Sequence, residues 1–252
     1  MHNFKNTFLL VILSLTLSGC AKTTMLRTAT DYQHSLPKLR NVVVLPPIVE
    51  VNAIDAGGKA VRQHDYEYQL EQNITDVLVE RLHAKGYAIK PVTKKAIHDF
   101  KLSRKVLAFQ EEYQGQIDAL YSPLLWEEKK AFAIETFFKT DTQELQNSIN
   151  ADAIMFVEYY GKSKTSGASA KDFAIGLFVP SHGNAIEDSA EFISLRLAII
   201  DPTTHKILWS NLAREGYGAF SSAFSNMSSL EKVDKKRINK LLDTILDKLP
   251  AR

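Results

Sequence analysis

Apolar residues recur along the chain at two spacings, one typical of strands and one typical of helices. A β-branched run at 41–45 stops at Pro46-Pro47 and predicts a buried strand, because proline cannot continue a central hydrogen-bonded ladder. Between Asp65 and Gly86 the apolar residues share one helical face, with Asp65 as the expected cap: Leu70, Ile74, Val77, Leu78 and Leu82. A second strand is expected at 87–92. Strand, helix, glycine and strand in this order predict a β-α-β unit with parallel strands.

The second half of the chain repeats both patterns. A mostly helical insertion is expected at about 94–139, followed by a strand at 151–160. Residues 191–200 alternate between apolar and polar positions, and 206–215 return after turn residues, which predicts a hairpin. A capping box at Ser228 opens a last amphipathic helix. We therefore predict an α/β fold, bordering on α+β. It is a mixed sheet with amphipathic helices packed on it and a C-terminal hairpin and helix.

The first twenty residues have a different pattern, that of an export signal. Lys5 is followed by an apolar stretch too short to span a bilayer and then by Leu17-Ser18-Gly19-Cys20. These four residues resemble the lipobox of bacterial lipoproteins, in which the cysteine receives a diacylglycerol and the peptide is cut before it. The resemblance implies a signal peptide at 1–19 and lipidation at Cys20. We expect a lipidated tether at 20–37, which has few large apolar residues, and a single α/β periplasmic domain at 38–252.

Composition restricts the function classes that remain. The chain has 252 residues, of which 45% are hydrophobic and 24% are charged, as in ordinary globular proteins. Its net charge of +2 gives no electrostatic reason to expect a nucleic-acid partner. Cys20 is the only cysteine, so the mature chain can form no internal disulfide and its fold depends on core packing.

Four segments in order resemble a group of periplasmic lipoproteins: NVVVLPPIVE, LHAKGYAIKPV, ADAIMFVEYYG and LRLAIIDPTTHKILWSN. The group includes the curli-secretion channel lipoprotein, the outer-membrane activator of a penicillin-binding protein, and a further family of lipoproteins. They share an α/β domain related to the N-terminal domain of the Tol-system periplasmic protein. In the turn that DPTTHK forms in the fourth segment, members of this group usually have a glycine before the lysine, whereas this chain has His205. The resemblance implies protein–protein work in the envelope instead of catalysis.

A search for catalytic patterns supports the same prediction. The sequence contains no His-Glu-x-x-His zinc pattern, no Gly-x-Ser-x-Gly elbow and no phosphate-binding glycine loop. We therefore predict a protein that is not an enzyme, with no catalytic residue, metal or cofactor. The segment 216–229 combines aromatic residues with glycine and serine, as a partner-binding loop does. Its candidate partner-binding residues are Tyr217, Phe220 and Phe224.

These observations predict a non-catalytic envelope lipoprotein that acts in protein–protein interaction or envelope assembly. Its expected partners are the membrane, through lipid on Cys20, and an envelope protein or further copies of itself. Two alternatives remain: a subunit of an oligomeric outer-membrane secretion channel, and a cell-wall hydrolase without a recognisable motif. Ala21 follows the cysteine where an aspartate would signal inner-membrane retention. The lipoprotein resemblance therefore implies that the protein is localised at the periplasmic face of the outer membrane.

Overall fold

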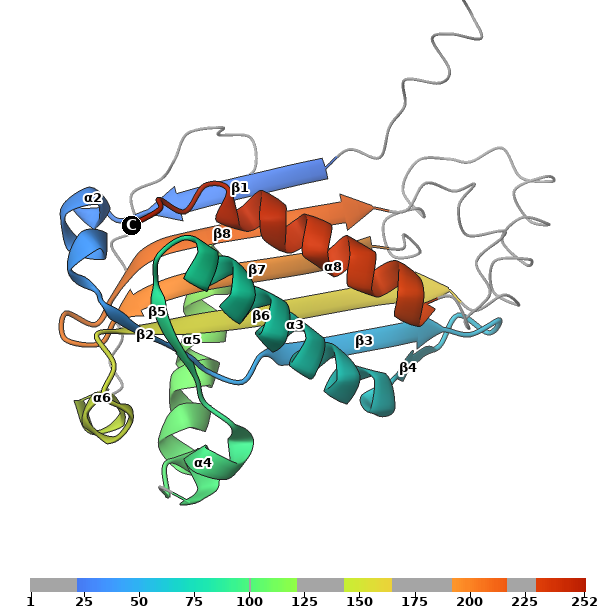
Figure 1. Cartoon of the computed structure of the whole chain (residues 1–252). Coiled ribbons are helices and arrows are strands. Elements are labelled where there is room, and N and C mark those ends of the chain that lie inside the picture. Colours follow the sequence, from blue (N-terminus) through green and yellow to red (C-terminus); the bar gives the residue numbers. More distant parts are fainter. Residues whose placement is uncertain (1–21, 100, 122–142, 165–191, 217–229) are drawn as a thin grey trace, which may run out of the picture.

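The computed structural model describes residues 22–99, 101–121, 143–164, 192–216 and 230–252 (Figure 1). Within these ranges the chain forms eight strands and a set of helices. In chain order they are β1 (Lys22–Thr28), α2 (Tyr32–Ser35), η1 (Leu36–Lys38), β2 (Asn41–Val44), β3 (Ile48–Ile54), β4 (Ala60–Arg62), α3 (His64–Ala84), β5 (Ala88–Pro91), α4 (Lys94–Asp99), α5 (Ser103–Leu120), α6 (Gln143–Ile149), β6 (Ala153–Lys164), β7 (Phe192–Asp201), β8 (Lys206–Gly216) and α8 (Leu230–Leu246). The predicted α/β class is confirmed.

The strands form one mixed sheet with the order β1-β8-β7-β6-β2-β5. The pairs β1–β8, β8–β7 and β7–β6 are antiparallel, whereas β2 is parallel to both β5 and β6. The predicted parallel pairing around the first long helix is thus confirmed, with β2 and β5 as its two strands. The predicted hairpin is β7–β8, and its register shifts between Ile199 and Ile200.

Each face of the sheet has its own hydrophobic core. α3 and α8 cover one face, and α4 and α5 lie on the other (Figure 1). The predicted α3 stripe is buried, and Leu78 packs in a core with Val42 and Met155. The sheet on which this stripe packs also contains Val43 and Phe156, but their side chains belong to the other core. Neighbouring strand residues point to opposite faces, so Val43 and Phe156 belong to the core under α5.

The strand at 41–45 stops where predicted and then resumes. β2 pairs with the start of β6, and β3 pairs with the later part of the same strand, in parallel. Pro46 and Pro47 lie between them and have no N–H to donate, so they interrupt one edge of β6. β3 then turns back through Gly57 and Gly58 into the antiparallel β4.

The tether expected at 20–37 is wrong from Lys22 onward. Residues 22–28 form β1, an edge strand that pairs with β8 over its whole length, and α2 and η1 follow directly. Met25 and Leu26 are half-buried against the two cores, and Leu36 is buried. β1 is held by backbone hydrogen bonds to β8, a strand far away in the sequence. Such pairing needs no apolar periodicity, so the sequence pattern did not indicate this strand.

The remaining expectations hold in part. Gly86 follows α3 and has a φ of +88°, a left-handed conformation common after helices. Gln63, and not Asp65, occupies the position before that helix. The insertion expected at 94–139 is helical in α4 and α5, and its later part lies outside the described residues. Among the helices that the structure describes, none is both long and apolar enough to span a membrane.

Candidate functional site

A groove of about 480 Å³ opens where β2 breaks from β3. Its walls come from the proline break, the first turns of α3, and the α4–α5 pair. We call it the α3–α5 groove, and it is lined by Pro46, Pro47, Ile48, Val49, Arg62, His64, Glu67, Tyr68, Glu71, Lys94, Ile97, Ser103, Val106, Leu107 and Gln110. Tyr68 is 61% exposed and Leu107 is 57% exposed, and both line it. In the described part of the chain, Val61 is the only other exposed large hydrophobic residue, and it is less exposed, at 44%.

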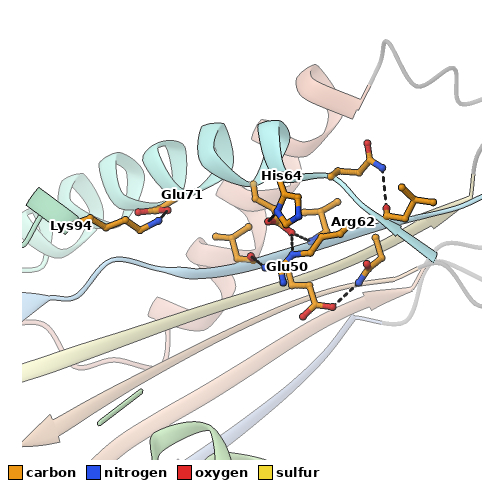
Figure 2. Close-up of polar contacts among 11 residues, drawn as sticks. Glu50, Arg62, His64, Glu71 and Lys94 are labelled. Atoms are coloured by element: carbon orange, nitrogen blue, oxygen red, sulfur yellow. Dashed lines mark hydrogen bonds and ion pairs between the residues drawn. The ribbon is translucent and has the colours of Figure 1, made fainter. Parts of the chain in front are cut away.

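The buried carboxylate of Glu67 lies at one end of the groove, where it contacts Arg62 and His64, which Figure 2 labels. The backbone N–H of Val51 donates to its Oε1 over 3.0 Å, and Nε of Arg62 donates to the same oxygen over 2.7 Å. Nδ1 of His64 lies 3.1 Å from the other oxygen, Oε2. Glu67 therefore connects α3 to both strands of the β3–β4 hairpin.

These contacts hold Glu67 in its ionised form. Burial raises the pKa of the Glu67 carboxyl, but the hydrogen bonds from Arg62 and Val51 outweigh burial and bring the pKa below its ordinary value. An ionised carboxylate only accepts, so the proton between Glu67 and His64 lies on Nδ1. A carboxylate with three donors already in place is poorly suited to move protons in catalysis. Its geometry is that of a structural acceptor.

A second ion pair crosses the groove from α3 to α4. Nζ of Lys94 donates to the carboxylate of Glu71, and the pair joins the two helices (Figure 2). Lys94 also begins a strongly basic segment at 94–105. That segment has five cationic residues against the single acidic Asp99: Lys94, Lys95, Lys101, Arg104 and Lys105. Ser103 lines both the groove and the hollow around this segment, so the two surfaces are continuous.

The chemistry of this surface suits contact with another molecule. It offers two exposed apolar side chains, paired polar groups around them and an excess of positive charge on one flank. Interfaces use this combination of an apolar centre with a polar rim. In the ranges that the structure describes, no group of three or more His, Cys, Asp or Glu residues is placed to hold a metal ion.

The residues singled out from the sequence fall outside the part of the chain that the structure describes. Cys20 is outside the described residues, and so are Tyr217, Phe220 and Phe224. The described neighbours of that aromatic segment are Gly216, the last residue of β8, and Leu230, the first of α8.

Sequence reasoning missed Tyr68 and Leu107, although a signal was present. The buried face of α5 consists of Val106, Phe109, Tyr113 and Ile117, and Leu107 is off that stripe. Tyr68 is likewise off the stripe that starts at Leu70 in α3. A large apolar residue on the polar face of an amphipathic helix is the observation that could have indicated a docking surface.

Comparison with protein families and with curated proteins finds no match to this chain. Among solved structures it is similar to a PelC dodecamer from Paraburkholderia phytofirmans. The identity is 12% and the TM-score 0.43, over 92% of this chain and 99% of that one. It is also similar to lipoprotein GNA1162 from Neisseria meningitidis, with 12% identity and a TM-score of 0.31, over 81% of this chain and 98% of that one. With TM-scores below 0.5, we infer no function from these likenesses.

Proposed function

We propose that this chain is a non-catalytic, lipid-anchored protein of the bacterial envelope that docks an acidic segment of another envelope protein. The α3–α5 groove is the observation that carries the proposal. Two exposed apolar side chains, Tyr68 and Leu107, line a groove that is continuous with the basic segment 94–105. An apolar side chain of the partner would enter the groove, and acidic neighbours would face the basic segment.

The charge of the surface selects the kind of partner. Arg62 and Lys94, the cationic residues lining the groove, are paired with Glu67 and Glu71. The excess positive charge lies on the flank at 94–105, and an acidic flank on the partner would complement it. Binding of this kind weakens as salt screens the charges. A partner without acidic residues would have only the apolar contact.

The lipobox supports the proposed location. Cys20 would carry the lipid, the signal at 1–19 would be removed, and Ala21 would allow transfer to the periplasmic face of the outer membrane. Several acyl chains hold a protein on a bilayer stably, whereas a single chain binds reversibly. Within this proposal the domain extends to β1, since that strand belongs to the sheet.

Cys20→Ser tests the lipid anchor. The variant has no thiol to accept diacylglycerol, so we expect it to lose all incorporation of labelled palmitate and to accumulate as the uncut precursor. Metabolic labelling followed by electrophoresis measures both effects. Palmitate label on the Cys20→Ser protein would contradict the proposal.

Leu107→Asp tests the docking surface. A carboxylate at this position places a charge in the apolar part of the groove, so we expect crosslinking between the chain and its envelope partner to fall by about tenfold, equivalent to roughly 1.4 kcal/mol. In-cell photo-crosslinking from position 68 gives the measurement. Ala108→Asp is the matched control, because Ala108 is exposed on the same turn of α5 but does not line the groove. Equal crosslinking of the two variants would show that the groove is not the docking site.

A further inference from the structure

The register of the sheet places one end of five strands on a common line. Lys22 pairs with Glu215, Glu215 with Ile193, Ile193 with Gly161, and Gly161 with Val51. This line runs from β1 across β8, β7 and β6 to β3, and Figure 1 shows these strand ends at one side of the molecule. We call this side the leading end of the sheet. The β7–β8 turn around Thr203 lies at the opposite end, roughly 30 Å away at the usual rise per strand residue.

The distance from Cys20 to this line is short. Two residue steps separate Cys20 from Lys22, and a chain spans at most about 3.6 Å per residue, so the lipidated residue lies within about 7 Å of the first residue of β1. β1 cannot lengthen this connection without giving up its pairing with β8. A lipid on Cys20 therefore holds the leading end close to the bilayer.

The β3–β4 hairpin projects beyond the same line. β3 continues for three residues after Val51, which amounts to roughly 10 Å, and the turn to β4 adds to this. The projection is longer than the connection from Cys20. The hairpin therefore meets the headgroups when the lipid is inserted.

The tip of the hairpin is built to keep its shape. Oδ1 of Asp55 accepts the backbone N–H groups of Gly57 and Lys59 over 2.8 Å and 2.9 Å, and Gly58 adopts a φ of +84°. The exposed side chains near the tip include Lys59 and Val61, and Val61 is 44% exposed. A cationic and an apolar side chain together suit the interface between headgroups and acyl chains.

We infer that the anchored protein stands on the bilayer with the β3–β4 hairpin against the headgroups and the β7–β8 turn directed away. This inference rests on the lipid anchor of the proposed function. The surface is a second, non-covalent contact with the membrane, and it fixes the orientation of the domain. The α3–α5 groove is lined by residues of β3 and β4, which Figure 1 shows across the sheet from β1, so a partner in the periplasm reaches it from the side.

Single-cysteine labelling tests the orientation. Lipidation consumes the thiol of Cys20, the only native cysteine, so an introduced cysteine is the one reactive thiol in the mature chain. Lys59→Cys and Ala60→Cys report on the hairpin, Thr203→Cys on the opposite turn, and Thr30→Cys on the far end of the β1 edge; all four positions are exposed. Each lipidated variant is labelled with a fluorophore and incorporated into phosphatidylethanolamine–phosphatidylglycerol vesicles that contain a headgroup-linked quencher.

We expect quenching to be several-fold stronger at positions 59 and 60 than at positions 203 and 30. Equal quenching at all four positions would overturn the inference, because the domain would then tumble on its anchor. Strong quenching at position 30 would overturn it as well, since the β1 edge would then lie on the bilayer. Flotation of the unlabelled chain with the vesicles is measured first. A chain that does not float contradicts the lipid anchor and thereby both proposals, whereas floating with uniform quenching contradicts the orientation alone.

Discussion

Replacing Leu78 with alanine is expected to lower the free energy of unfolding by about 2–5 kcal/mol, through the lost transfer energy and the cavity that remains. Leu78 is fully buried in the second half of α3, and its side chain packs in the core between α3, α8 and the sheet. The strands of the sheet on one side and two helices on the other leave little room for the surrounding structure to close the cavity. The expected effect therefore lies towards the upper part of this range.

Urea denaturation of the purified mature domain measures the effect of Leu78→Ala. Gln72→Ala is the matched control, because Gln72 is exposed on the same helix and its replacement removes no core contact. We expect the control to shift the free energy of unfolding by less than about 0.5 kcal/mol. Equal midpoints for the two variants would show that this face of α3 is not part of the core.

Replacing Arg196 with methionine is expected to cost about 2–4 kcal/mol, because it leaves the carboxylate of Glu158 largely buried without its partner. Nε and Nη2 of Arg196 both donate to Glu158 Oε2, and Nη1 donates to Asp118 over 3.0 Å. The side chains of Arg196 and Glu158 are only 12% and 18% exposed. Burial lowers the pKa of Arg196, but the two carboxylates outweigh burial and raise the pKa above its ordinary value.

A double variant separates the charge from the packing. Arg196→Met together with Glu158→Leu replaces both partners with apolar groups, and we expect it to recover most of the stability that the single variant loses. Asp118→Ala is the control, because its side chain is 70% exposed and its ion pair should contribute less than about 1 kcal/mol. Thermal or urea unfolding of the three variants gives the comparison. A double variant no more stable than Arg196→Met would show that shape, and not the unpaired charge, determines the loss.

Local patterns in the sequence were enough to predict the elements whose side chains are sorted by burial. The α3 stripe from Leu70 to Leu82 and the alternation in β7 each report on a face that packs against a core. The same patterns contain no information on which of the two faces of the sheet a helix covers. The burial of Val43 and Phe156 therefore did not indicate that they face α5, whereas their neighbours Val42 and Met155 face α3.

Elements specified by distant partners were harder to predict. β1 has half-buried side chains at Met25 and Leu26 and is held mainly by backbone pairing with β8, near the other end of the chain. The α3–α5 groove combines residues from the proline break, α3, α4 and α5, which only the tertiary fold brings together. The exposed Tyr68 and Leu107 could have been noticed from the sequence, but their shared location could not.

The pairing of β1 with β8 also determines how the protein would bear load. A force that draws the domain away from the membrane would enter through Cys20 and act along β1, in the direction of the strand. Seven residue pairs join β1 to β8, and such a force loads their hydrogen bonds together, in shear, instead of opening them one after another. A partner that pulls on the docked domain would therefore meet a connection that resists sudden rupture.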